Sequence, residues 1–164
     1  MRIIGCGNRQ RGDDGAGILV AERLRHLGID AGTCSGEATE LIETWAGSGD
    51  VILIDAVVTG APGGTVHVWD GLQKIDPPGK TASTHGLGVA QAIELARVLN
   101  RLPERLRIYG IEGRAFDPGF PISSQVHAAI EEVVQRIIAD VSASADAREG
   151  ERPKLRGSSI HLTP

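Results

Sequence analysis

The chain has 164 residues, of which 41% are hydrophobic and 23% are charged, proportions that are typical of one soluble globular domain. Its net charge of −4 argues against nucleic-acid binding, and no apolar run is long enough to cross a bilayer. Because the first residues also lack the hydrophobic region of a signal peptide, we expect a cytoplasmic protein that has neither nucleic acid nor membrane as a partner.

Segments typical of strands and helices alternate along the chain. In chain order we first expect a strand, a helix, a strand and a helix at Arg2–Cys6, Asp14–Leu27, Ile29–Cys34 and Thr39–Ala46. Two strands and a loop are then expected at Val51–Val58, Thr65–Trp69 and Asp76–Thr84, the second strand pairing back as a hairpin. The chain continues with a helix at His85–Leu99, a strand at Arg105–Ile111 and a last helix whose apolar stripe runs from Val126 to Ile138.

The strand at Val51–Val58 is apolar on both faces, which is typical of the middle of a parallel sheet covered by helices on both sides. We therefore predict an α/β fold of three layers, a mostly parallel twisted sheet with helices on both faces. After Val141 the composition becomes polar, so we expect a single domain over residues 1–141 and a flexible tail over 142–164. In such a fold ligands bind beyond the carboxyl ends of the strands, near the topological switch point.

Two adjacent aspartates, Asp13 and Asp14, follow a glycine-rich turn after the first strand. An aspartate at the start of a helix caps it and complements the helix dipole, which explains one of the two carboxylates. The other lies at the carboxyl edge of the predicted sheet, where ligands bind. We assign the capping role to Asp13 and a functional role to Asp14.

Asp55 interrupts the apolar run of the expected central strand near its end. Burying a carboxylate there is costly unless it is paired, hydrogen-bonded or bound to a metal, and capping of a loop is the structural alternative. His85 immediately precedes a buried helix at the same edge of the sheet. Together, Asp14, Asp55 and His85 form a set of ligands that suits a divalent transition metal with open coordination positions.

The two cysteines, Cys6 and Cys34, lie in isolated apolar surroundings, and neither belongs to a CxxC pair. In a reducing compartment we do not expect a disulfide between them, and we interpret both as small core residues.

A dinucleotide-binding loop is the rival interpretation of the first glycine turn. The G-x-G-x-x-G pattern fails because Gln10 takes the place of the third glycine, and no acidic residue ends the second strand. Two aspartates would also face the pyrophosphate. A nucleotide-binding regulatory module is therefore the weaker alternative.

Four stretches of the sequence resemble the hydrogenase maturation proteases, over about Met1 to Val141. They are GCGNRQRGDDGAG at Gly5–Gly17, LIDAV at Leu53–Val57 with PGGTV at Pro62–Val66, STHGLG at Ser83–Gly88, and YGIEGRAFDPGFPISSQVHAAI at Tyr109–Ile130. One such motif is weak support, whereas four in the right order are strong.

The resemblance implies a soluble endopeptidase that removes a C-terminal extension from the large-subunit precursor of a nickel–iron hydrogenase and so enables its maturation. The positions at which the family contacts its metal fall on Asp14, Asp55 and His85, the residues already selected. The resemblance also implies that the metal is a nickel ion supplied by the substrate precursor, with no organic cofactor. We expect a monomer, because the site must reach into a large partner.

One stretch departs from the family pattern, since many relatives carry a GGT-like turn where this chain has Ser35–Thr39. Glu37 in this stretch either caps the next helix, which we favour, or orients water or binds metal. A resident-metal hydrolase of a small substrate and a non-catalytic, nickel-dependent binding module stay open as alternatives, because both would use the same three residues.

Overall fold

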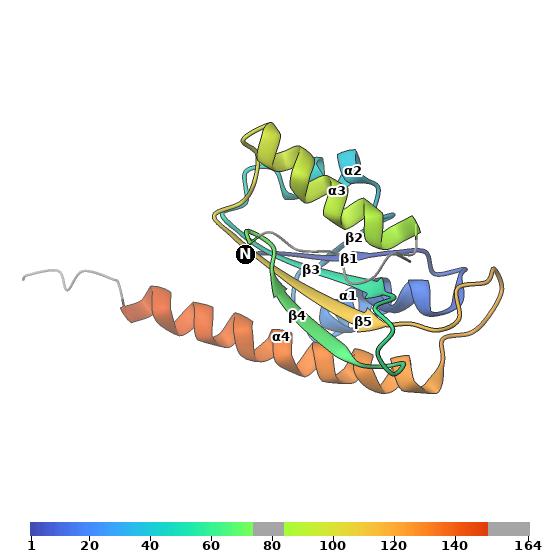
Figure 1. The fold of residues 1–164 in the computed structure, drawn as a ribbon. Coiled ribbons are helices and arrows are strands. Elements are labelled where there is room, and N and C mark those ends of the chain that lie inside the picture. The colour runs from blue at the N-terminus through green and yellow to red at the C-terminus, as the bar shows by residue number, and fades with distance from the viewer. Residues whose placement is uncertain (74–83, 151–164) are drawn as a thin grey trace, which may run out of the picture.

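The computed structural model describes residues 1–73 and 84–150 (Figure 1). The strands are β1 (Arg2–Cys6), β2 (Gly32–Cys34), β3 (Asp50–Val57), β4 (Val66–Asp70) and β5 (Arg105–Glu112). The helices are the 3-10 helix η1 (Gly12–Gly15), α1 (Ala16–His26), α2 (Ala38–Trp45), α3 (Thr84–Val98) and α4 (Ser124–Gly150). Within these described ranges, no helix is both long and apolar enough to cross a membrane.

The strands form one sheet in the order β2-β1-β3-β5-β4, in which β4 alone runs antiparallel to its neighbour. The predicted α/β class and mostly parallel sheet are confirmed. The expected hairpin was wrong, because β4 pairs with β5, placing Val66 opposite Ile111. Both sides of β3 are already occupied by parallel partners, β1 and β5, so β4 is left with the edge of the sheet.

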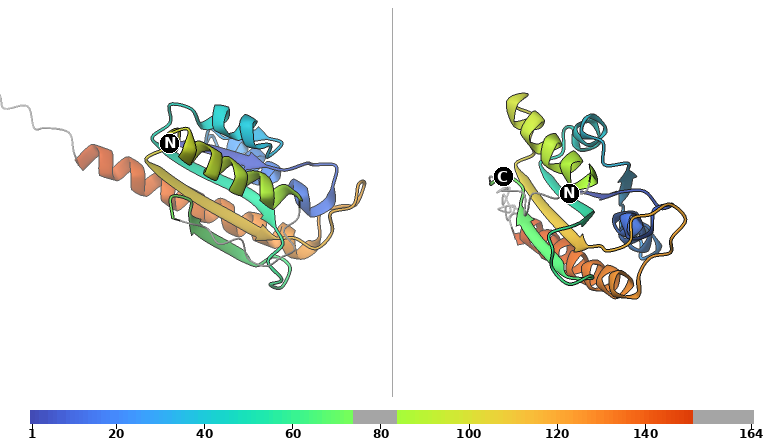
Figure 2. Two further views of the ribbon diagram at one scale, coloured as in Figure 1. Left: turned by 45° about the horizontal axis from the view of Figure 1, so that its top comes forward. Right: turned by 45° about the vertical axis from the view of Figure 1, so that its right-hand side comes forward.

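Helices cover both faces of the sheet, α1 and α4 on one and α2 and α3 on the other (Figures 1 and 2). The two faces carry separate cores of largely aliphatic residues, and β3 contributes to both because its residues 51–56 are all buried. The apolar stripe predicted for the last helix packs in the first core, where Val126, Val133 and Ile137 are fully buried. Burial of this aliphatic surface is the main source of stability.

Helix α4 continues past Val141 to Gly150, through the segment where we expected a tail to begin. The alanines and charged residues of this segment favour helix, so the change of composition marks the end of the apolar stripe and not of the helix. Residues 151–164 lie outside the described part of the chain. The division into a domain over 1–141 and a tail over 142–164 stays a prediction.

Helix α1 lies against β1 and β3 at Gly17. A Cβ atom at this position would be 2.3 Å from the carbonyl oxygen of Ile54 and 2.5 Å from that of Cys6. The missing side chain therefore lets the helix backbone rest directly on the two central strands. Since η1 precedes α1 without a break, this contact also fixes where Asp13 and Asp14 meet the sheet.

Gly17→Ala is expected to lower the free energy of unfolding by about 3 kcal/mol or more, because two strand backbones must move to admit one methyl group. Gly28→Ala is the control: Gly28 has a φ of 81° and nothing within 4 Å of an added Cβ, so only left-handed strain of about 1 to 2 kcal/mol applies. Urea unfolding measures both variants, and equal losses would contradict the close contact at Gly17.

Candidate functional site

Asp14 and Asp55 lie at the carboxyl edge of the sheet, one after and one within the two strands that flank its switch point. The chain passes from β1 to β2 on one side and from β3 to β5 on the other, so the switch point lies between β1 and β3. Asp14 follows β1 in η1, and Asp55 is near the end of β3. Both are buried, with 0% and 3% of their surface exposed, and the charge of Asp14 acts on Asp55. The structure therefore brings these two predicted site residues together.

Asp55 is held in a setting that disfavours its charge. Burial raises the pKa of Asp55 well above its usual range, and the negative charge of Asp14 raises it further. The N–H of Ala56 donates to Asp55 Oδ1 at 2.9 Å, which lowers the pKa without offsetting the other effects. This hydrogen bond joins neighbouring residues and anchors no loop, so loop capping does not explain the buried carboxylate. Such a perturbed group at a switch point is typical of a functional residue.

The turn after β1 folds Asp14 back over the end of that strand. The N–H of Asn8 donates to the Asp14 carbonyl oxygen at 3.2 Å, and the N–H of Gly7 donates to the Cys34 carbonyl oxygen at 3.2 Å. Gly7 has a φ of 127°, and a Cβ there would lie 1.9 Å from the Asp14 carbonyl oxygen. Only glycine fits at this position, which explains why the turn is glycine-rich.

Several N–H groups of this turn donate hydrogen bonds within the protein. Gln10 N–H donates to Asn8 Oδ1 at 2.9 Å, and Arg11 N–H donates to the Asn8 carbonyl oxygen at 3.1 Å. Asp13 N–H reaches the carbonyl oxygen of Ala115 at 2.7 Å. A phosphate-binding loop instead directs such N–H groups at its ligand. The geometry thus argues against nucleotide binding here.

Asp13 anchors the loop between β5 and α4. Its carboxylate accepts hydrogen bonds from the N–H groups of Arg114, Ala115 and Ser123 at 2.8, 3.0 and 2.8 Å. Burial raises the pKa of Asp13, but these hydrogen bonds lower it by more, so that it lies below the usual value. The predicted helix cap was wrong, since no side chain caps η1. The three donors come from a distant part of the sequence, and they bind the carboxylate in place of the N–H groups at the start of the helix.

His85 lies in the first turn of α3, and its side chain is outside the described residues. The backbone nearby approaches the sheet edge, because a Cβ on Gly88 would be 2.2 Å from the carbonyl oxygen of Gly36, in the loop after β2. Helix α3 thus begins on the side where the parallel strands end (Figure 1). Among the side chains that are described, no three potential metal ligands gather around one point. The set of Asp14, Asp55 and His85 stays a prediction.

Two smaller predictions are confirmed. Glu37 caps α2, because its Oε2 accepts from the N–H groups of Thr39 and Glu40, both at 3.1 Å. Cys6 and Cys34 are buried core residues on the face that α2 and α3 cover.

Glu112, the last residue of β5, is a buried carboxylate at this edge that we did not single out in the sequence. It accepts hydrogen bonds from Thr59 N–H at 2.9 Å, Thr59 Oγ1 at 2.8 Å and Gly60 N–H at 2.9 Å. His67 Nε2 lies 3.4 Å from Glu112 Oε2. Glu112 therefore holds the turn after β3 in place. The signal was available, because Glu112 ends an apolar strand much as Asp55 does.

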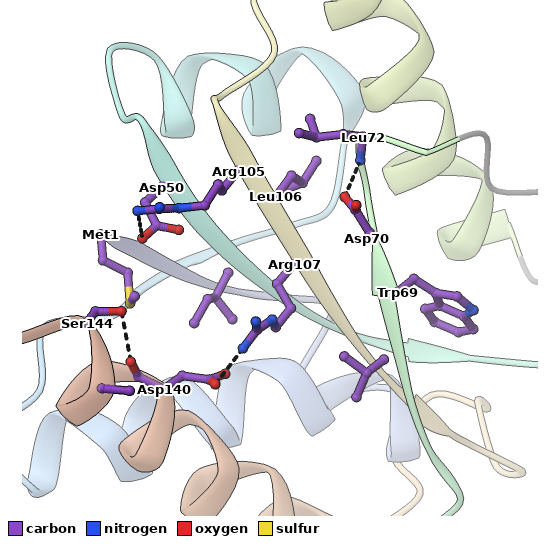
Figure 3. Close-up of a pocket in the computed structure, with 13 residues that line it drawn as sticks. Met1, Asp50, Trp69, Asp70, Leu72, Arg105, Leu106, Arg107, Asp140 and Ser144 are labelled. Carbon is purple, nitrogen blue, oxygen red and sulfur yellow. Dashed lines mark hydrogen bonds and ion pairs between the residues drawn. The ribbon is translucent and has the colours of Figure 1, made fainter. Parts of the chain in front are cut away.

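A hollow of about 740 Å³ lies at the opposite end of the strands, where β3 and β5 begin and α4 passes (Figure 3). Four of its charged side chains form two ion pairs, Arg105 with Asp50 and Arg107 with Asp140, and the carboxylate of Asp70 accepts a hydrogen bond from the N–H of Leu72. Because Asp14 and Asp55 are at the other end of the sheet, this hollow is not part of the candidate site.

Asp55→Asn is expected to raise the free energy of unfolding by about 1 kcal/mol at neutral pH, because it removes a carboxylate whose charged form is disfavoured by burial and by the charge of Asp14. The folded protein binds the Asp55 proton more tightly than the unfolded chain does, since the pKa is raised on folding. Such a group contributes most to the free energy of unfolding below its pKa in the unfolded chain, and this contribution is lost as the pH rises through its pKa in the folded protein. The gain from the substitution should therefore be larger at about pH 8 than at about pH 4 in urea unfolding.

Asp50→Asn is the matched control, at the other end of the same strand. Asp50 pairs with the exposed Arg105 at 3.1 Å, and loss of that pair should change the free energy of unfolding by less than about 0.5 kcal/mol. The same pH dependence in both variants would show that the raised pKa of Asp55 does not affect the free energy of unfolding.

Comparisons with known proteins agree with this fold. A family model described as hydrogenase maturation protease matches residues 20–140. The hydrogenase 2 maturation protease of Escherichia coli (strain K12) is 26% identical in an alignment 153 residues long, and the match covers 84% of this chain and 87% of that protein.

Two solved structures are similar over nearly their whole length. The [NiFe] hydrogenase maturation protease HybD from Thermococcus kodakarensis has a TM-score of 0.68 and 25% identity, covering 87% of this chain and 99% of that one. The hydrogenase maturating endopeptidase HybD from Escherichia coli, at 23% identity and a TM-score of 0.68, covers 88% and 94% and shows the same fold. Because the family model matches most of this chain, the chain belongs to the hydrogenase maturation protease family.

Proposed function

We propose that this chain is the endopeptidase that removes a C-terminal extension from the nickel-loaded large-subunit precursor of a nickel–iron hydrogenase. Membership of the family supports the reaction class, a peptide-bond hydrolysis. The nickel ion belongs to the precursor and is part of the substrate. Asp14, Asp55 and His85 would recognise it.

The observation that carries the proposal is the pair of buried carboxylates, Asp14 and Asp55, at the switch point of the sheet. Burial raises the pKa of Asp55 and the negative charge of Asp14 raises it further, and a divalent cation bound at this site would offset that repulsion. A precursor that carries nickel supplies that cation, whereas an empty precursor does not. Recognition is then conditional on the metal, which spares precursors that have not received it.

The carboxylates would complete the coordination of a nickel ion already held by the precursor. The precursor's nickel would supply polarisation of the scissile carbonyl group, and a carboxylate of this chain would accept the proton of the attacking water. His85, at the start of α3, is the third ligand in this proposal.

Two alternatives use the same residues. A resident-metal hydrolase would bind nickel without the precursor, which isothermal titration of the protein alone with nickel detects. A non-catalytic module would bind the nickel-loaded precursor and leave it intact. The monomeric state, the cytoplasmic location and the lack of an organic cofactor also stay predictions.

The decisive test is incubation of the purified protein with its hydrogenase large-subunit precursor, nickel-free and nickel-loaded, followed by intact mass spectrometry. Loss of a C-terminal peptide is expected from the nickel-loaded precursor only. Asp14→Asn, Asp55→Asn and His85→Gln should each slow this cleavage by about 100-fold or more, because each removes or misplaces a contact with the reacting centre.

Asp50→Asn and Glu37→Gln should cleave at the rate of the unmodified protein, since Asp50 lies at the far end of β3 and Glu37 caps α2. Binding of a verified nickel-loaded precursor without cleavage would favour the binding module. Full activity of Asp55→Asn would overturn the assignment of the site and leave the family membership intact.

A further inference from the structure

Cys6, Cys34 and Asp55 lie in one row across three neighbouring strands. Cys6 is the direct partner of Cys34 in the pairing of β1 with β2. Gly5 is the partner of Ile54 in the pairing of β1 with β3, so the next residues, Cys6 and Asp55, share the next level of the sheet. Residues at one level of a parallel pair point to the same face. The two sulfur atoms are thus in line with the candidate site.

The two thiols are already in contact. Cys6 Sγ and Cys34 Sγ are 3.4 Å apart, and both cysteines are free. Neighbouring strands are about 4.8 Å apart, which lies within the range of Cα separations, about 4.4 to 6.8 Å, that a disulfide spans. Bond formation requires the sulfur atoms to approach to about 2.05 Å, a movement of little more than an ångström.

We propose that Cys6 and Cys34 are a reversible oxidation site, and that their disulfide slows the reaction of the adjacent carboxylate site. Cys34 reacts first, because it keeps 6% of its surface exposed whereas Cys6 is completely buried. The oxidant that fits this narrow access is small, and hydrogen peroxide is the one we name. The second half of the proposal rests on the proposed function.

The chemistry is balanced by that oxidant. The Cys34 thiolate attacks one peroxide oxygen, the O–O bond breaks, and the other oxygen leaves as hydroxide, which takes up a proton to become water. The resulting sulfenic acid is attacked by the sulfur of Cys6, so that an S–S bond forms and a second water leaves. Two thiols and one peroxide give one disulfide and two waters, and an external thiol reverses the change by exchange.

The disulfide would affect the site of Asp14 and Asp55 through the turn after β1. Gly7 follows Cys6 directly, and its N–H donates to the carbonyl oxygen of Cys34 at 3.2 Å. Gly7 is also packed so closely against the Asp14 backbone that not even a methyl group fits between them. Moving Cys6 toward Cys34 therefore displaces Asp14. Because Cys6 also lies beside Asp55 in the neighbouring strand, the same movement changes the surroundings of Asp55.

The first experiment tests the bond itself and needs no precursor. The full-length protein is treated with hydrogen peroxide, blocked with N-ethylmaleimide under denaturing conditions and weighed by intact mass spectrometry. Because the chain has only two cysteines, loss of two hydrogens with no maleimide adduct identifies the Cys6–Cys34 disulfide. Dithiothreitol should restore two adducts, and Cys34→Ala should show no such loss. Two labelled thiols after peroxide, stable higher oxides or linked dimers would overturn the site.

The second experiment tests the link to Asp14 and Asp55. Exchange of the Gly7 and Asn8 amide hydrogens should change on oxidation, and cleavage of the nickel-loaded precursor should slow by about tenfold or more and recover with dithiothreitol. Cys34→Ala, treated identically, should keep its rate. Unchanged exchange and cleavage in a protein shown to carry the disulfide would overturn the link. If the reduced protein itself does not cleave, the proposed function fails, while the mass and exchange results still decide this inference.

Discussion

Asp14 and Asp55 place two carboxylates of like charge in a buried position at the switch point of the sheet, and much of the structure around them serves to hold that arrangement. Burial and the charge of Asp14 both raise the pKa of Asp55. Gly17 seats α1 directly on β1 and β3, and Gly7 closes the turn over Asp14. In the proposed function, the nickel ion of the precursor would offset this repulsion.

The carboxylates at this edge of the sheet divide into two groups by their hydrogen bonds. Asp13 and Glu112 each accept from three donor groups and hold a loop or turn in place. Asp55 accepts from the N–H of its own neighbour, Ala56, and its pKa rises while that of Asp13 falls. The same kind of side chain therefore has a lowered pKa where donors converge on it and a raised pKa where burial and a second charge dominate.

The row of Cys34, Cys6 and Asp55 shows how a parallel sheet places side chains from distant segments at one level. Each residue is buried, and each meets the others through strand pairing and not through local sequence. A covalent change at one position of such a row displaces the neighbouring residues, because packed interiors transmit small displacements. Chemistry at the two sulfur atoms and chemistry at the carboxylates are for this reason expected to be coupled.

The sequence by itself determined the alternation of strands and helices, the central place of β3 and the selection of Asp14 and Asp55, because periodicity and a charge in an apolar run are local signals. It did not determine the partners of Asp13, the role of Glu112 or the place of β4 beside β5. Only the tertiary structure decided these. Asp13 accepts hydrogen bonds from residues about a hundred positions away, and β4 reached the edge because β3 was already paired on both sides. Contacts of this kind depend on which segments the folded chain brings together, so they cannot be predicted from local propensity.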